Sequence, residues 1–406
     1  MATDGPDETR WLAINAGSSS LKLAIFDTAG NRTHAVTAED LGDAGGDLGE
    51  AHAHALHELL TALPPAEAGP FRGIAHRVVH GGDRFDTATE IDQAVIDALH
   101  EIEPLAPLHN PLAAACIEAA RHHFPDTPQF ALFDTAFHRD LPPESRDYAL
   151  PAWCRDRLGI RRYGFHGLSA ANALHRIAEA TGHPPARLNL IVLHLGNGAS
   201  VTAIRGGHSV ATSMGMTPLE GLVMGTRAGD IDPAIPGVLE RRGGLSNDEV
   251  DHLLNHESGL LGLCGTRDMR EIHDAIDRGS EQASTALAMY IHRIRHYLGG
   301  YLVNLGRLDA LVFTGGIGEH DIVVRESVCE GLGVMGLALD MAANRRDQNG
   351  VRALHQPHSP SSIWVVPADE EWEMIRQIQE ISEGPREPDT TRRALSRADS
   401  GRSSAV

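Results

Sequence analysis

Lysine is almost absent from this chain of 406 residues, because Lys22 is the only one and arginine supplies the remaining strong bases. A Walker A loop requires a lysine directly after a glycine, whereas Lys22 stands between two leucines. A protein kinase requires a strand lysine together with several further motifs that the chain does not contain. If the protein handles a nucleotide, it must therefore use another scaffold.

Cysteine is also scarce, with four residues that form no C-x-x-C pair, and the chain has no H-E-x-x-H segment. These absences leave zinc and redox motifs without support, and unpaired thiols are typical of a reducing cytoplasm. No apolar run is long enough to span a bilayer. The formal net charge of −20 argues against nucleic-acid backbones and anionic membranes. We therefore expect a cytoplasmic protein that binds neither nucleic acid nor membrane.

The length suits two domains better than one, and 42% hydrophobic residues are enough to form substantial cores. Apolar strand patterns alternate with helical patterns, which predicts an α/β fold. Strands are expected at 11–16, 21–26, 73–79, 128–133, 188–195, 200–204, 309–313 and 362–366. Helices are expected at about 91–102, 110–123, 169–180, 246–256, 281–304 and 369–381.

Two strand pairs have the same form and indicate a duplication with one hairpin in each half. The turn Asn15–Ser20 joins the first pair, and Gly196–Gly198 joins the second. Prolines 142, 143 and 151 interrupt the pattern and place a domain boundary near residue 150. We expect an N-terminal domain at 1–150 completed by a helix at 371–384, a C-terminal domain at 151–370 that binds nucleotide and forms a dimer, and a polar, disordered tail at 385–406.

Three Gly-containing turns could contact a nucleotide. In Asn15–Ser20, backbone N–H groups and serine hydroxyls could hold an anion. In His194–Gly198, two glycines would let the backbone approach a phosphate closely. Gly315–Glu319 could lie as a loop against adenosine, although it lacks the spacing of a dinucleotide site. Each segment is equally typical of an ordinary turn.

Three charged residues are candidates for anion chemistry. Arg77 lies in an apolar strand and, if that strand is buried, requires an anionic partner, which a structural ion pair would also supply. Arg227 lies among small residues that expose its guanidinium to a carboxylate or phosphoryl group, or to solvent. Asp134 follows a strand, where ligands commonly bind in α/β sheets, although it could instead cap the next turn.

The remaining candidates are two histidines and an acidic segment. His109 and His166 could be structural residues or could stabilise charge in a reaction. Asp369–Glu371 could begin a helix, with its acids at the positive end, or could supply a Mg²⁺ ligand. From the residues alone these alternatives stay open.

The order and spacing of these segments together resemble one family, acetate kinase, over about residues 10 to 380. The segments that carry the resemblance are Asn15–Lys22, His76–Gly82, Pro107–Pro111, Phe133–His138, Tyr163–Gly167, His194–Gly198, Met224–Arg227, Asp268–Arg270, Thr314–Glu319 and Asp369–Glu371. The resemblance implies two duplicated domains of the actin and ribonuclease H type, with a nucleotide cleft between them. It also implies a homodimer that uses Mg²⁺, or Mn²⁺, with ATP to convert acetate reversibly to acetyl phosphate and ADP.

The resemblance assigns roles to matching positions. Catalytic roles are implied for Asp134, Arg77, Arg227, His166 and His109. A substrate pocket is implied at Arg77, Val79, Leu108, Phe165 and Pro218. Nucleotide contacts are implied for Lys22, Ser18, Ser20, His194, Asn197, Gly198, Asp268, Met269, Arg270, Gly315, Gly316, Ile317, Gly318 and Glu319, and metal contacts for Asn15 and Glu370.

The implied reaction makes physical sense for these residue types. Acetate is ionised near neutral pH, so it needs no strong base, and in-line transfer depends on positioning and charge neutralisation. We therefore interpret Asp134 as an orienting group rather than a general base. Two other functions stay open: a propionate kinase, because one methylene discriminates weakly, and an actin- or chaperone-like ATPase, against which the carboxylate-binding set argues.

Overall fold

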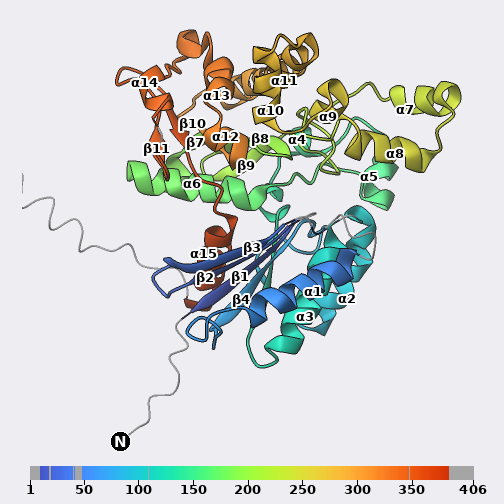
Figure 1. The fold of residues 1–406 in the computed structure, drawn as a ribbon, viewed down its shortest axis with the longest axis vertical. Helices are drawn as coiled ribbons and strands as arrows, with labels where there is room; N and C mark the ends of the chain where they lie inside the picture. The colour runs from blue at the N-terminus through green and yellow to red at the C-terminus, as the bar shows by residue number, and fades with distance from the viewer. Residues whose placement is uncertain are drawn as a thin grey trace, which may run out of the picture.

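A computed structural model describes residues 10–17, 20–39, 41, 48–107, 109–346 and 348–383. These residues form two lobes, each built around a six-stranded sheet (Figure 1). No helix among them is both long enough and apolar enough to cross a membrane. The expected Ser18, Leu108 and 385–406 tail lie outside the described residues.

The first sheet has the strand order β3-β2-β1-β4-β6-β5. Strands β1, β4 and β6 are parallel, whereas β2, β3 and β5 add antiparallel edges. All residues of β1 and β6 are buried, which explains their nearly continuous apolar sequences. The bounds are β1 Trp11–Ala16, β2 Leu21–Phe26, β3 Arg32–Ala38, β4 Gly73–Val78, β5 Thr89–Glu90 and β6 Gln129–Phe133.

The second sheet repeats this arrangement with the order β9-β8-β7-β10-β12-β11. Strands β7, β10 and β12 are parallel, and the other three pair antiparallel. Strand order and strand direction therefore match position by position between the two sheets, and the predicted duplication is confirmed. The bounds are β7 Asn189–Leu195, β8 Ala199–Arg205, β9 His208–Thr212, β10 Ala310–Thr314, β11 Arg352–Ala353 and β12 Ser362–Val365.

Helices cover both sheets, as expected for an α/β fold. Those that precede β7 are α1 Leu48–Thr61, α2 Gln93–Ile102, α3 Asn110–His123, α4 Pro143–Arg146, α5 Ala152–Leu158 and α6 Gly167–Thr181. Those that follow β9 are α7 Ile235–Val238, α8 Asn247–His256, α9 Gly259–Cys264, α10 Met269–Asp277, α11 Glu281–Leu305, α12 Gly315–His320, α13 Ile322–Cys329, α14 Met341–Asn344 and α15 Glu370–Glu383.

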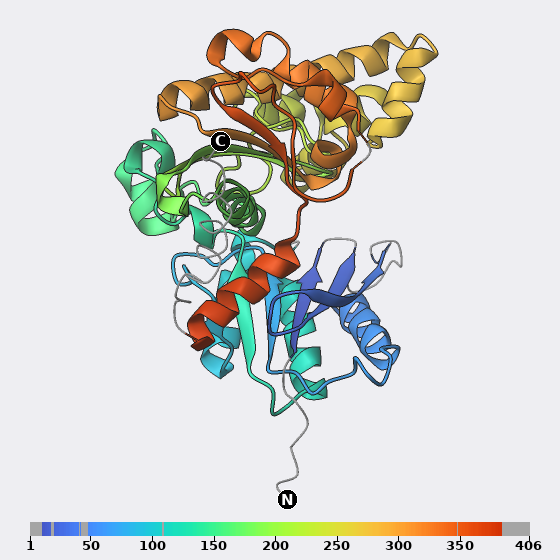
Figure 2. The same ribbon diagram turned by 90° about the vertical axis from the view of Figure 1, so that its left-hand side faces the viewer.

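Helix α15 returns from the second sheet to the first lobe (Figure 2). Its Met374, Ile375 and Ile378 pack in one buried cluster with Trp11 and Ala75 of the first sheet. Removing these side chains from water stabilises the return of the chain by about 1.5–3 kcal/mol for each large side chain. The helix thereby places its first residue, Glu370, at the edge of the first sheet. The domain boundary near residue 150 stays a prediction.

Candidate active site

Three predicted residues meet where the parallel strands of the first sheet end. Asn15 lies near the end of β1, Arg77 near the end of β4, and Asp134 directly after β6. Arg77 donates two hydrogen bonds to Asp134, from Nε to Oδ1 over 3.1 Å and from Nη2 to Oδ2 over 2.6 Å. Its Nη1 donates to Asn15 Oδ1 over 3.3 Å. The expectation that Arg77 requires an anionic partner is confirmed, and that partner is Asp134.

Helix α15 adds two carboxylates to this edge. Asn15 Nδ2 donates to Glu370 Oε2 over 3.1 Å and to Glu371 Oε1 over 2.8 Å. Arg77 Nε lies 3.6 Å from Glu370 Oε2. The Asn15 amide nitrogen thus donates to two carboxylates, and its amide oxygen accepts a hydrogen bond from Arg77. Residues from two ends of the chain therefore form one charged network.

The two carboxylates beside Arg77 differ in their pKa. Burial raises the pKa of Asp134 above its ordinary value; Glu370 adds to the rise, and Arg77 opposes it. Burial also acts to raise the pKa of Glu370, but Arg77 and His194 outweigh it and lower that pKa. Burial opposes the charge on Arg77, yet Asp134 and Glu370 raise its pKa. When two carboxylates lie beside one cation, their pKa values are expected to move apart in this way.

The oxygens at this edge fit a hard divalent cation. Mg²⁺ binds carboxylate and amide oxygens and usually takes only one or two protein ligands, with water and phosphates completing its shell. The Glu370 carboxylate and the Asn15 carbonyl oxygen supply such donors. The side chain of Glu370 is 12% exposed, so solvent and a ligand can reach it.

The second lobe contributes His166, His194 and Gly198. The rings of His166 and His194 stack with centroids 4.0 Å apart and planes inclined by 26°. A Cβ atom placed on Gly198 would lie 3.4 Å from His166 Nε2 and 3.7 Å from Arg227 Nη1. The Gly196–Gly198 turn therefore lies directly against both predicted charge-stabilising groups. Asn197, in the same turn, lies against Gly225 through its side-chain oxygen.

Burial lowers the pKa of each predicted histidine of the site. Burial lowers the pKa of His166 well below its ordinary value, and His194 and Arg77 lower it further. Burial likewise lowers the pKa of His194. Burial, Arg227 and Arg77 together lower the pKa of His109 to about 3. His109 therefore lies within the field of both arginines.

Arg227 differs from Arg77 in its partners. Its Nη1 donates to the carbonyl oxygen of Pro218 over 3.4 Å, and within the described ranges no acidic side chain forms an ion pair with it. Burial lowers its pKa. Val79 and Phe165 are buried in the same apolar cluster as Met224, close to Arg227 in the sequence. Of the predicted substrate residues, Val79 and Phe165 are thus buried core side chains, and Pro218 contacts Arg227 through its carbonyl oxygen.

The residues predicted to contact the nucleotide differ from one another in their burial and in their partners. Gly315–Glu319 begins helix α12, so the expected loop was wrong. Gly315 has φ of 77°, and a Cβ there would lie 2.7 Å from the carbonyl oxygen of Leu195. This close approach requires glycine and joins the ends of β10 and β7. The carboxylate of Glu319 already has a partner within the chain, because its Oε1 accepts a hydrogen bond from Ala368 N over 2.9 Å.

Asp268 and Arg270 pair with each other at the start of α10, with Nη2 and Oδ2 2.6 Å apart. Met269 between them has a buried side chain. Lys22 is exposed on β2, directly opposite Asn15 in the sheet register. The carbonyl oxygen of Ser20 accepts a hydrogen bond from Gly17 N over 2.8 Å.

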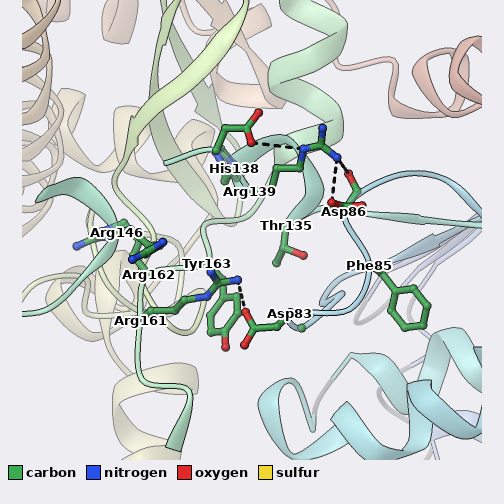
Figure 3. Close-up of a pocket in the computed structure, with 12 residues that line it drawn as sticks. Asp83, Phe85, Asp86, Thr135, His138, Arg139, Arg146, Arg161, Arg162 and Tyr163 are labelled. Carbon is green, nitrogen blue, oxygen red and sulfur yellow. Dashed lines mark hydrogen bonds and ion pairs between the residues drawn. The ribbon is translucent and has the colours of Figure 1, made fainter. Parts of the chain in front are cut away.

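A separate pocket of about 340 Å³ is lined by four arginines but by neither Arg77 nor Arg227 (Figure 3). Each arginine has an acidic partner: the pairs are Arg139 with Asp86, Arg146 with Asp147, Arg161 with Asp83 and Arg162 with Glu220. The positive charge of this pocket is therefore already compensated. Arg227 is a stronger candidate for an incoming anion.

Two serines that sequence reasoning missed contact the stacked histidines. Ser200 Oγ lies 3.0 Å from His166 Nδ1, and Ser169 Oγ lies 2.8 Å from His194 Nδ1. In the second hairpin, Ser200 is directly opposite His194. The predicted hairpin register could have brought Ser200 to the site, whereas nothing in the sequence pairs Ser169 with His194.

The two repeated sheets, with the same strand order and direction, define a two-domain protein of the actin-like fold class. The chain belongs to the acetokinase family, whose model matches residues 10–377. It is 45% identical to an acetate kinase of Streptomyces coelicolor, over 94% of this chain and 99% of that protein. It is 44% identical to an acetate kinase of Syntrophobacter fumaroxidans, over 92% of this chain and 97% of the other.

Solved structures agree with this assignment. The structure of Porphyromonas gingivalis acetate kinase matches with a TM-score of 0.84 and 36% identity, covering 92% of this chain and all of that one (100%). A propionate kinase from Francisella tularensis matches with a TM-score of 0.80 and 34% identity, covering 91% of this chain and 98% of the other.

Proposed function

We propose that this protein transfers the terminal phosphoryl group of ATP to acetate, reversibly, to give acetyl phosphate and ADP. The observation that carries the proposal is Arg227, a partly buried cation without an acidic partner among the described residues, which lies beside the Gly196–Gly198 turn and His166. A small carboxylate with a short apolar tail has the matching chemistry. The names of the relatives support the same substrate.

Arg227 would hold the carboxylate of acetate through its planar fork of donors. Its Nη1 donates to the carbonyl oxygen of Pro218, and we propose that Val79 and Phe165, which belong to one apolar cluster, would contact the methyl group. An ionised carboxylate is already a nucleophile, so this half of the site has only to orient it.

The second requirement is charge stabilisation on the transferring group. His166 and His194 are neutral donors on one side, and the backbone of Asn197 and Gly198 adds N–H groups. Arg77 adds positive charge from the first lobe and is held in place by Asp134. Donors that are already in position need no reorganisation when the charge develops.

Asn15 and Glu370 would hold the divalent cation, which we propose to be Mg²⁺. When bound, such a cation supplies positive charge to the phosphate oxygens. Arg77 orients both ligands, because it contacts Asn15 and lies 3.6 Å from Glu370. The homodimer implied by the family resemblance forms part of this proposal.

Trapping of the acyl phosphate with hydroxylamine tests the reaction directly. The purified full chain with ATP, Mg²⁺ and acetate is expected to form acetohydroxamate in amounts that match the ADP released. Formate and a chain carrying Arg227→Ala serve as controls. If no short carboxylic acid gives a hydroxamate, the kinase proposal is rejected.

Propionate is the second candidate substrate. The likeness to the Francisella propionate kinase favours it, and one methylene in an apolar pocket changes binding by only about 1–3 kcal/mol. Measuring kcat/KM for acetate, propionate and butyrate separates the two. A higher value for propionate than for acetate would replace the proposed substrate but leave the reaction type unchanged.

A further inference from the structure

We propose that Ser200 and Ser169 are positioning residues that fix His166 and His194 as a stacked pair of neutral Nε2–H donors facing the phosphate cleft. This inference rests on the proposed function, which gives the two donors their task. The serines would act through the histidines and would not touch the substrate.

The geometry begins with two buried hydroxyls. Ser200 is 1% exposed and Ser169 is fully buried. Each lies within hydrogen-bond distance of one imidazole Nδ1 and has no other hydrogen-bond partner in the part of the chain that the structure describes. A hydroxyl can donate or accept, so the direction of each bond determines the tautomer of the ring.

The direction of each serine–histidine hydrogen bond follows from the free-energy cost of leaving a buried hydroxyl hydrogen without an acceptor. If Nδ1 carried the proton, the serine oxygen would accept it, and the buried hydroxyl hydrogen would then have no acceptor. Leaving a buried donor unpaired costs about 1–3 kcal/mol. If the serine donates to Nδ1, only an oxygen lone pair is left unused. The ring proton is then on Nε2.

A third buried pair in the same molecule shows the same arrangement with the direction fixed independently. His138 Nδ1 lies 2.8 Å from Ser209 Oγ, and His138 Nε2 lies 3.0 Å from the carbonyl oxygen of Phe165. A carbonyl only accepts, so Nε2 carries the proton and Ser209 must donate to Nδ1. The chain thus already contains a serine that fixes this tautomer.

The Nε2 atoms of the stacked pair point toward the second phosphate turn. The Cβ position of Gly198 is 3.4 Å from His166 Nε2, and that of Gly196 is 3.9 Å from His194 Nε2. Rings stacked at 4.0 Å disfavour two positive charges because these would repel each other. Two parallel neutral donors avoid that repulsion and still offer N–H groups to phosphoryl oxygens.

The test is the tautomer itself, read by NMR on the full chain labelled with ¹⁵N-histidine. Long-range ¹H–¹⁵N spectra distinguish a protonated from an unprotonated ring nitrogen, and spectra of His166→Gln and His194→Gln identify the two rings. Both histidines are expected to carry the proton on Nε2 at pH 7.5. A proton on Nδ1 of either histidine in the unmodified chain would overturn the inference.

Ser200→Ala should let His166 populate both tautomers and lower kcat about tenfold, less than the loss of about 10²- to 10³-fold that removal of a direct donor causes. The KM values for ATP and acetate should change little. Ser200→Thr keeps the hydroxyl and should retain the Nε2–H tautomer. An unchanged tautomer in Ser200→Ala would count against the proposal.

Ser209→Ala is the matched control, because it removes the same kind of bond from a buried serine. His138 should keep its tautomer, since Phe165 still accepts from Nε2, and the His166 spectrum should not change. The two proposals fail separately. A missing hydroxamate product would reject the kinase function, whereas the spectra would still report whether the serines fix the tautomers.

Discussion

The two arginines of the site reach it from different lobes and in different electrostatic states. Arg77, from β4 of the first lobe, is bound to Asp134 at two points and lies near Glu370. Arg227, from the second lobe, contacts a carbonyl oxygen and has no acidic partner among the described residues. A partly buried cation without a counter-charge is costly to keep. Arg77 is thus neutralised within the chain, and we propose that Arg227 receives its counter-charge from a bound anion.

The largest expected effect follows from removing the unpaired cation. Arg227→Ala should lower kcat/KM for acetate by about 10³-fold or more, the scale known for arginines that stabilise phosphoryl transfer. The free energy of unfolding should not fall, because no ion pair is broken. Steady-state kinetics and urea unfolding measure the two quantities. Arg227→Lys should recover only part of the activity, since lysine lacks the planar fork.

A result in which Arg227→Ala loses stability as well as activity would contradict the comparison. It would mean that Arg227, like Arg77, is held by a partner within the chain. A loss of less than about tenfold in kcat/KM would show that the carboxylate is held elsewhere.

Breaking the Arg77–Asp134 ion pair should lower the stability of the fold as well as the activity. Asp134→Asn removes the closest counter-charge of Arg77 and should lower the free energy of unfolding by about 3 kcal/mol, the low end for a broken buried pair, because Glu370 stays near Arg77. Its kcat should fall and its Mg²⁺ dependence should change, because Arg77 orients Asn15 and Glu370. Asp140→Asn is the matched control: it weakens a surface contact to Arg139 and should cost about 0–1 kcal/mol. Normal kcat and Mg²⁺ dependence in Asp134→Asn would reject the orienting role of Asp134.

Much of this contrast could be read from the sequence, because it depends on local patterns. The buried strands of both sheets were predicted from their apolar runs. An arginine inside one of these runs required a partner, and an aspartate directly after a neighbouring parallel strand is in the right place to supply it. Only the identity of that partner needed the structure. Arg227 was singled out because its small neighbours were expected to expose it, whereas in the structure it is partly buried.

Other elements could not be predicted, for identifiable reasons. Strand β3 is largely exposed, and its mixed polar sequence carries no continuous apolar signal. Helix α1 was missed, as were the short edge strands β5 and β11. The glycines of Gly315–Glu319 indicated a loop, whereas the positive φ of Gly315 alone makes the turn and the next residues are helical. The contact of Asn15 with Glu371 spans nearly the whole chain and follows from the packing of α15.

The loss of stability at low pH should further distinguish Arg227 from Arg77. His109 has a pKa of about 3 because of burial, then Arg227, then Arg77. Below its ordinary pKa of about 6.5 the unfolded chain takes up a proton that the folded chain refuses, so stability falls as pH drops from about 6.5 toward 3. In Arg227→Ala one opposing charge is gone and the pKa of His109 should rise. Between pH 7.5 and 3, that variant should lose about 1 kcal/mol less stability than the unmodified chain, because the folded His109 takes up its proton only at the acid end of this range.

Urea unfolding at the two pH values checks this difference, and NMR titration of His109 checks its cause. Arg278→Ala, at the far end of α10, is the control and should leave the acid response unchanged. An equal loss of stability in Arg227→Ala and in the unmodified chain would mean that Arg227 does not act on His109.

The smallest effect is expected at Arg270, an exposed cation that, like Arg77, has an acid partner. Its side chain is 89% exposed and pairs with Asp268, and surface pairs contribute little to stability. Arg270→Ala should therefore leave unfolding unchanged. If its guanidinium contacts adenosine, KM for ATP should rise several-fold while kcat and KM for acetate stay the same. Arg278→Ala removes the same charge from the opposite end of the helix, so an equal rise in KM for ATP would indicate a general electrostatic effect. A rise confined to Arg270→Ala would show that Arg270 contacts the nucleotide, although it pairs with Asp268 in this structure.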